Sequence, residues 1–428
     1  MAELFSDYKC PSCSGTMSFD AASGNLKCEY CGTEMSVEEA KKHYAAENQK
    51  AAETKGNAAS EDDGNWGQEQ GAMKAYRCQS CGAELVCDET TAATSCPYCG
   101  NTAVMPQQFG GMQRPKYVIP FKVTKDAAVE KMKDYCKGKR LLPKAFVNGN
   151  HIEEVKGVYV PFWLYSGTVD ADIRYEAEIE EVKRTDKEKI TTTKYYEVHR
   201  KGTIDFDKIP ADASTRMPDD LMDSIEPYDY KELRGFEMEY LPGYLADKYD
   251  VDSKESTERT RKRAVGSTES MFRDTVTGYT RVRELPVGKR IDFRAEKNEY
   301  AMLPVWLLST SWNNGNYLFA VNGQTGEMTG NLPVNRTKQI VCDVIAAIIA
   351  CIVTLLIVGT DLWYMGLIAA AVAAFLVNSV LMSGMKPVAK KNQANRYVEK
   401  NGGGGVKLSI KKDRYIRTNV KREPIEKK

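Results

Sequence analysis

Few of the side chains and motifs on which catalysis depends occur in this sequence of 428 residues. It has only three histidines (His43, His151 and His199), and none of them neighbours a serine or cysteine in a recognisable nucleophile motif. The phosphate loop Gly-x4-Gly-Lys-Ser/Thr is also missing, because both Gly-Lys pairs, at 138–139 and 288–289, are followed by arginine. These absences exclude a motor of the phosphate-loop class and predict a protein that is not an enzyme.

Carboxylates gather at two places, 219–226 and 247–252. We interpret both groups as charges at helix starts, where the helix dipole favours acidic side chains. A hydrolase that uses these carboxylates for acid–base chemistry is a further hypothesis, and it is the one with the least support in the sequence.

The first 20 residues lack an apolar run, so the sequence predicts no cleavable secretory signal. The chain nevertheless contains 12 cysteines. Without an export signal this number indicates a reducing compartment, where Cys-x-x-Cys pairs bind metal more often than they form disulfides.

Eight of the cysteines form two blocks of the same spacing, which superpose at a shift of 68 residues. In each block 14 residues separate two Cys-x-x-Cys pairs, and a glycine follows each pair at once or one residue later. Two such turns can direct four thiolates at one ion, in the closed tetrahedral geometry of structural zinc. The predicted ligands of two Zn²⁺ ions are Cys10, Cys13, Cys28 and Cys31 in the first block, and Cys78, Cys81, Cys96 and Cys99 in the second.

Each block is too small to bury a core of its own, so a bound metal must supply folding energy, on the order of 10 kcal/mol. Iron in a rubredoxin-like site and a redox or disulfide role remain alternatives to zinc. Cys87 takes the place of Phe19 in the first block, which predicts an apolar filler and not a fifth ligand. Residues 1–110 carry 8 basic and 16 acidic side chains, a net charge of −8, which disfavours nucleic-acid binding by the blocks and favours protein contact.

The remaining soluble part predicts a mixed domain. Ser36 and Glu39 form a capping box that begins a helix to about Lys50, and 51–71 has the composition of a disordered tether that lets the first block move independently. Apolar residues alternate over 169–179, which predicts a half-buried strand; a charged turn then leads into a returning strand. A helix is expected at 124–138 with Cys136 in the core, and another within 244–272 that projects into solvent, because its middle is charged all round.

A short motif occurs twice in this domain. Pro161 and Trp163 in the first copy correspond to Pro304 and Trp306 in the second, within Val-Pro-Phe-Trp-Leu and Leu-Pro-Val-Trp-Leu. The echo indicates a duplicated β unit.

Residues 340–385 are almost wholly apolar and are interrupted only at 359–361. Each half is long enough to cross a bilayer, so the segment predicts a transmembrane helical hairpin; a buried helix pair in a soluble core is the alternative. Lysine and arginine flank both outer ends, which places both termini in the cytoplasm by the positive-inside rule. Small residues at four-residue spacing on both helices predict close packing.

The tail from Lys386 carries 14 basic and 4 acidic residues, a net charge of +10. It suits the anionic lipid of the inner leaflet. A solvated disordered tail and RNA binding are alternatives, and alternation at Val406, Leu408 and Ile410 could add an edge strand.

The predicted fold class is α+β, with two four-cysteine zinc ribbons, a mixed antiparallel-sheet and helix domain, and a C-terminal two-helix transmembrane hairpin. The predicted parts are zinc ribbon 1 (1–35), a helix and disordered linker (36–75), zinc ribbon 2 (76–105), an α+β cytoplasmic domain (116–335), the hairpin (339–385) and a basic cytoplasmic tail (386–428).

Several strings resemble a family of bacterial membrane proteins described as containing a transcription-factor-IIB-type (TFIIB-type) zinc ribbon. The resemblance covers nearly the whole chain, and it implies zinc and membrane anchoring but no established activity. Some members carry a name taken from the primosomal helicase, which the missing phosphate loop does not support. The strings are Cys-Pro-Tyr-Cys-Gly (96–100), Tyr-Val-Ile-Pro-Phe (117–121), Gly-Val-Tyr-Val-Pro-Phe-Trp (157–163), Met-Pro-Asp-Asp-Leu-Met-Asp-Ser-Ile-Glu (217–226), Leu-Pro-Gly-Tyr-Leu-Ala-Asp (241–247), Leu-Pro-Val-Trp (303–306) and Asn-Gly-Gln-Thr-Gly (322–326).

The sequence thus favours a non-enzymatic adaptor at the bacterial inner membrane, with zinc ribbons that contact protein partners in the cytosol. The alternative function is nucleic-acid binding by a membrane-tethered factor, through the ribbons or the basic tail.

Overall fold

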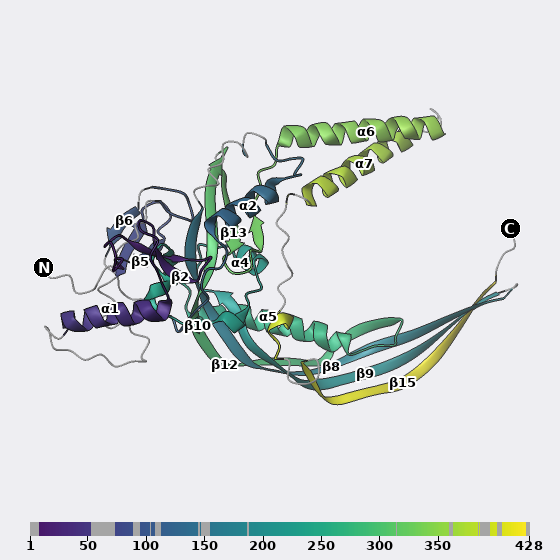
Figure 1. Cartoon of the computed structure of the whole chain (residues 1–428). Helices are drawn as coiled ribbons and strands as arrows, with labels where there is room; N and C mark the ends of the chain where they lie inside the picture. Colours follow the sequence, from purple (N-terminus) through teal and green to yellow (C-terminus); the bar gives the residue numbers. More distant parts are fainter. Residues whose placement is uncertain are drawn as a thin grey trace. The chain divides into compact units, whose positions relative to one another are not determined.

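The structure is a computed structural model that shows a mixed α/β chain with two four-cysteine clusters and a C-terminal pair of long apolar helices (Figure 1). It describes residues 8–52, 73–88, 95–102, 104–107, 113–143, 146, 155–185, 188–313, 315–358, 363–383, 385, 394–399 and 405–424. The chain divides into two compact units, described separately below. The first consists of Met1–Pro161, Ser214–Asp250 and Ala301–Lys390, and the second of Phe162–Ala213, Val251–Tyr300 and Lys391–Lys428.

The first four-cysteine block, called ribbon 1, has a small antiparallel sheet and one helix. The sheet has the order β1 (Met17–Asp20), β2 (Asn25–Cys28), β3 (Glu34–Met35), and helix α1 spans Val37–Ala52. The predicted capping box is confirmed: the backbone N–H of Glu39 donates to Ser36 Oγ (3.2 Å), and that of Ser36 donates to Glu39 Oε2 (2.9 Å).

Ribbon 1 packs on the rest of the first unit. The ring of Phe19 meets that of Tyr240 edge-on at a centroid distance of 5.5 Å, and the N–H of Phe19 donates to the carbonyl of Pro242 (2.9 Å). The prediction that this block moves independently is therefore wrong for its described part, because Phe19 packs against the rest of the unit. The predicted tether lies outside the described residues, except that α1 reaches Ala52.

The second four-cysteine block, called ribbon 2, extends a larger sheet. Its strands are β4 (Met73–Cys78), β5 (Glu84–Asp88) and β6 (Val104–Gln107). Strand β4 pairs with both others, and β5 also pairs with β11 (Leu245–Asp247), where Ala246 lies opposite Val86. Ribbon 2 is thus hydrogen-bonded into the body of the first unit.

The repeated Pro-x-Trp motif marks two modules with the same local geometry. In one module, short strand β7 (Tyr117–Val118) runs parallel to the start of the motif in β12 (Arg281–Trp312), with Tyr117 opposite Ala301. The chain then reaches Val123, whose carbonyl accepts a hydrogen bond from the indole N–H of Trp306 (2.8 Å). Thr124 caps the following helix α2 (Lys125–Cys136), whose buried residues include the predicted Cys136.

The other module repeats this arrangement. Strand β11 runs parallel to β8 (Lys156–Arg184), with Leu245 opposite Val158, and the carbonyl of Val251 accepts from the indole N–H of Trp163 (2.9 Å). In both modules the accepting carbonyl lies six residues after the paired residue of the short strand. The tryptophan lies five residues after the paired residue of the long strand. Asp252 caps helix α5 (Ser253–Asp274) as Thr124 caps α2. The predicted duplication is confirmed. Strand β7 lies in the repeat that contains β8 but pairs with β12, and β11 lies in the repeat that contains β12 but pairs with β8.

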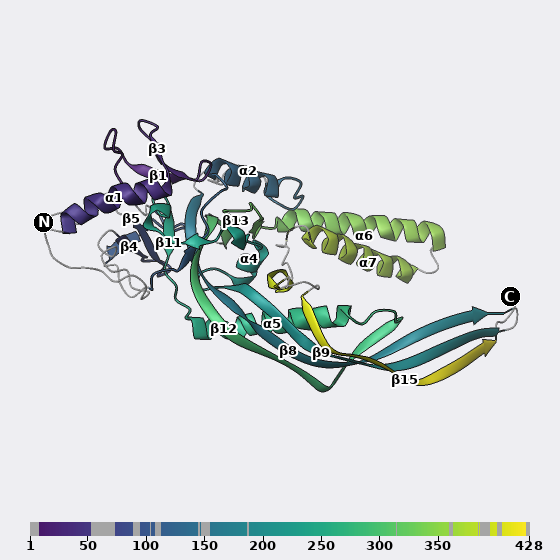
Figure 2. The same cartoon turned by 60° about the horizontal axis from the view of Figure 1, so that its bottom comes forward.

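In the second unit, strands β8, β9 (Glu188–Asp212) and β15 (Val406–Pro424) run side by side (Figures 1 and 2). The half-buried strand is confirmed, and β9 returns antiparallel to it; residues 186 and 187 of the predicted charged turn lie outside the described residues. For residues 406–424 the disordered-tail alternative is wrong, and the edge-strand alternative is right and extends over 19 residues.

Helix α5 does not project into solvent as predicted. One face is buried, and Arg263 is only 2% exposed because Nη1 donates to the carbonyl of Pro210 (2.5 Å). Serine and threonine side chains complete this buried face, so hydropathy alone does not reveal it. Ala394, which precedes a short 3-10 helix η6 (Asn395–Tyr397), donates its N–H to Ser267 of α5 (2.5 Å).

Helices α6 (Arg336–Val358) and α7 (Trp363–Ser383) lie side by side in Figures 1 and 2. Both are long and apolar enough to cross a membrane. A Cβ added at Gly366 would lie 3.2 Å from Cys351 Sγ, so a small residue permits this close approach, as predicted. The remaining elements are α4 (Asp219–Ser224), η3 (Tyr230–Glu232), β10 (Arg234–Gly235), η4 (Met238–Tyr240), β13 (Gly315–Asn322) and β14 (Met328–Gly330).

Candidate metal centres

The four cysteines of ribbon 1 converge on one point. Cys10 begins a tight turn in which the N–H of Ser14 donates to the Cys10 carbonyl (2.8 Å), and Cys28 begins another in which Gly32 donates to the Cys28 carbonyl (3.0 Å). The residue in the left-handed region is Gly32 (φ 74°) in the second turn but Ser14 (φ 58°), and not Gly15, in the first. These turns direct both sulfurs of each pair to the same side of the backbone.

The sulfur positions fit a single tetrahedral ion. The Sγ atoms of Cys10 and Cys31 are 3.5 Å apart, as are those of Cys13 and Cys28, and all four lie within 4.8 Å of one another. Four sulfurs bonded to one ion at about 2.3 Å would lie about 3.8 Å apart. The two measured sulfur–sulfur distances are slightly shorter than this ideal distance, and the four sulfurs are close enough together to bind one central ion.

Ribbon 2 repeats the same construction. The N–H groups of Gly82 and Gly100 donate to the carbonyls of Cys78 and Cys96 (both 2.9 Å). The Sγ atoms of Cys78 and Cys99 are 3.6 Å apart, and those of Cys81 and Cys96 are also 3.6 Å apart. Each ribbon therefore brings together the four cysteines that the spacing predicted, and each group could hold one metal ion.

Backbone amides make some of these thiols acidic. Burial alone would raise the pKa of Cys10, but the N–H groups of Ser12 and Cys13 outweigh it and lower that pKa to about 6. The same balance, with amides of Cys81 and Ser80, lowers the pKa of Cys78 to about 7. Amide dipoles that stabilise a thiolate also stabilise a metal-bound sulfur.

Residues outside ribbon 2 hold its cluster in place. Arg216 donates from Nη2 to the carbonyl of Gly82 (2.9 Å) and pairs through Nη1 with Asp250 (2.7 Å). Asp247 is fully buried and accepts a hydrogen bond from Ser214 Oγ (2.7 Å). Burial raises the pKa of Asp247 to about 6, and its carboxylate also faces Tyr98 of the second cysteine turn. The interpretation of 247–252 as helix-start charges is right only for Asp252; Asp247 and Asp250 instead support the ribbon, which sequence spacing gave no way to detect.

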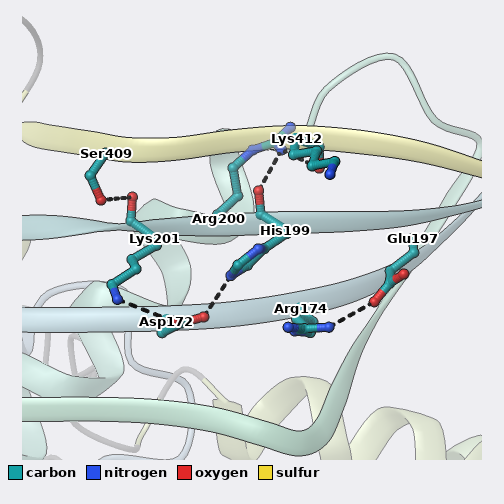
Figure 3. A network of polar contacts seen from close by, with 8 residues as sticks. All are labelled: Asp172, Arg174, Glu197, His199, Arg200, Lys201, Ser409 and Lys412. Atoms are coloured by element: carbon teal, nitrogen blue, oxygen red, sulfur yellow. Dashed lines mark hydrogen bonds and ion pairs between the residues drawn. The ribbon is translucent and has the colours of Figure 1, made fainter.

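The other candidate residues lie away from the clusters along the chain. Cys87 is buried in β5, consistent with an apolar filler. His199 of β9 places Nε2 2.7 Å from Asp172 Oδ1 on β8, in the polar network of Figure 3. His43 lies on α1 against the ring of Tyr44, and His151 lies outside the described residues.

One curated protein is similar to this chain over most of its length. The chain is 31% identical over 333 residues to a Bacillus subtilis protein described as uncharacterized protein YdjG, an alignment that covers 77% of this chain and 91% of YdjG. No protein-family model matches the chain. No solved structure matches it.

Proposed function

The chain belongs to the family of Bacillus subtilis YdjG, and from that premise we propose that it is a non-enzymatic, membrane-anchored adaptor. In this proposal its two zinc ribbons and α+β body recruit protein partners to the cytoplasmic face of the inner membrane. The observation that carries the proposal is the combination of two closed four-thiol clusters with two apolar helices in one chain.

Zinc is the proposed ion because four thiolates in a tetrahedral arrangement are its usual structural site. Such a site leaves no coordination position for water or substrate, which argues for a structural and not a catalytic role. Iron in a rubredoxin-like site is the alternative for the same four ligands, and the TFIIB-type ribbon resemblance favours zinc.

The proposed orientation follows from charge at the helix ends. Arg336 and Lys338 stand at the start of α6, and Lys386, Lys390 and Lys391 follow α7 in the sequence, whereas Asp361 alone marks the break between the helices. By the positive-inside rule both outer ends face the cytosol, and so do the ribbons.

A comparison of equivalent tyrosines indicates where ribbon 1 could meet a partner. Tyr98 and Tyr30 occupy the same place in the second cysteine turn of their ribbons. Tyr98 is 8% exposed because ribbon 2 packs against the rest of the first unit, but Tyr30 is 79% exposed. A large exposed aromatic on a rigid turn is a typical anchor of a protein interface.

Photo-crosslinking in cells tests the adaptor proposal. A photoreactive phenylalanine analogue at Tyr30 is expected to capture a discrete protein partner in the membrane fraction. The same analogue at Val287, which is 84% exposed on β12, serves as the matched control and should capture nothing discrete. Equal, diffuse crosslinking from both positions, or none from Tyr30, would remove the case for ribbon 1 as the recruiting module.

Nucleic-acid binding is the second candidate. Strand β15 favours it, because it carries seven basic and two acidic residues, and Arg417 stacks over the ring of Tyr195 at 4.9 Å. The acidic composition of the ribbon region opposes it.

A further inference from the structure

Strand β15 presents an unpaired edge in the second unit. It pairs with β9 along one side, and no described strand pairs with its other side. Its outer half is exposed on both faces as well. An edge strand offers a row of backbone N–H and C=O groups that another extended chain can complete.

The inner side of β15 is held firmly, so the open edge is pre-organised. Arg200 of β9 is 1% exposed, and Nη1 contacts Asp413 Oδ1 (2.5 Å) and the carbonyl of Lys412 (3.4 Å). The hydroxyl of Tyr279 donates to Asp413 Oδ2 (2.9 Å), and Ser409 Oγ donates to the carbonyl of Lys201 (3.2 Å). Figure 3 shows Arg200, Lys412 and Ser409 where β15 meets β9.

Two irregularities divide the edge and leave a short regular stretch between them. The register shifts between Leu408 and Ile410, and again between Tyr415 and Arg417. Between these points, residues 410–415 pair one-to-one with β9. This stretch is long enough to pair with an incoming strand, whereas the bulges at its ends limit pairing beyond it.

The stretch is strongly basic. Lys412 and Arg414 lie opposite His199 and Glu197 and therefore share one face of the sheet, and Lys411 lies on the other. None of the three forms an ion pair with a carboxylate of the described residues, whereas Lys407 of the same strand pairs with Asp205 (2.6 Å). Opposite charges on directly adjacent strands are stabilising and like charges are destabilising.

We propose that the open edge of β15 at residues 410–415 binds an acidic, extended segment of a protein partner by strand addition. This names a partner class for the proposed adaptor and rests on that function only for its biological purpose. A second copy of β15 does not fit, because each strand has a net charge of +5 (seven basic minus two acidic residues). Lipid headgroups and nucleic acids are also anionic, but they do not present alternating N–H and C=O groups at the spacing of a strand.

The test uses the full chain in neutral lipid nanodiscs and a fluorescent peptide of four Glu-Thr repeats. In an extended conformation all its carboxylates lie on one face, as Lys412 and Arg414 do. Fluorescence anisotropy should show binding that the Lys412→Glu/Arg414→Glu variant weakens by about 10-fold or more. The uncharged Lys412→Gln/Arg414→Gln variant should bind with intermediate affinity, and circular dichroism should show both variants folded as the wild type.

Two controls separate strand addition from attraction between charges. Lys254→Glu/Lys262→Glu, on the exposed side of α5, changes the net charge of the same unit equally and should alter binding by less than about 2-fold. The same peptide N-methylated at every amide keeps its carboxylates but has no N–H groups to donate to the carbonyls of the edge, and it should bind about 10-fold more weakly.

Equal binding of the N-methylated peptide, or equal loss from the α5 variant, would overturn the proposal. Displacement of the peptide by an oligouridine or by phosphatidylglycerol vesicles at lower concentrations than unlabelled peptide would instead assign the edge to nucleic acid or lipid. Neither result bears on crosslinking from Tyr30, so failure here is distinguishable from failure of the adaptor proposal.

Discussion

Replacing Cys96 by serine is expected to unfold ribbon 2 and to expose the strand with which it pairs. Loss of one thiolate removes most of the metal-coupled folding energy, on the order of 10 kcal/mol. Because β5 pairs with β11, and Arg216 holds the carbonyl of Gly82, the disruption should spread into the body of the first unit. Amide hydrogen exchange should show protection of Leu245–Asp247 reduced about 100-fold, equivalent to about 2.7 kcal/mol.

The matched control is Cys28→Ser in ribbon 1, which removes the equivalent ligand. Ribbon 1 forms its own three-stranded sheet, which contacts the unit through the ring and the N–H of Phe19 and does not pair with β11. Exchange should therefore increase over β1, β2 and β3 while β11 stays protected. If both variants left β11 equally protected, ribbon 2 would not be integral to the unit, and the pairing between β5 and β11 would carry little stability.

Substitution of Trp306 or Trp163 by alanine is expected to produce the second large effect, about 4 kcal/mol each in the free energy of unfolding. Each indole is 6% exposed and fixes the carbonyl that precedes a helix cap, at Val123 or Val251. The loss combines a large cavity with a buried carbonyl left without its donor. Urea unfolding followed by circular dichroism measures both variants in the same detergent.

Tryptophan to phenylalanine at each position separates the two contributions. The ring volume is largely kept, so the loss should fall to roughly 1–2 kcal/mol, the value of the hydrogen bond and a small cavity. Because the two modules have the same geometry, the two positions should respond alike. A loss at Trp306 several times that at Trp163 would contradict the equivalence of the modules.

The parts of this fold that the sequence predicts are those governed by local spacing. Cys-x-x-Cys turns, the alternation along β8, the capping box at Ser36 and the apolar length of α6 and α7 each depend on neighbours in the chain. The echo at Trp163 and Trp306 also indicated the duplication, although only coordinates show that each repeat pairs with the hairpin of the other.

The rest depends on contacts that spacing does not encode. Helix α5 is charged along its sequence, yet it buries Arg263 because a distant carbonyl accepts its charge-assisted hydrogen bond. Tyr30 and Tyr98 occupy identical motif positions, but only Tyr98 is buried, because ribbon 2 packs against the part of the first unit that contains Asp247. The open edge of β15 likewise appears only when its pairing with β9 is known.

Metal stoichiometry on protein extracted from membranes tests the central claim most directly. The proposal predicts two zinc ions per chain, both released when a mercurial reagent titrates the thiols, and one ion per chain in Cys28→Ser. Protein that fractionates away from the membrane, or that carries one ion or none, or iron in place of zinc, would contradict it.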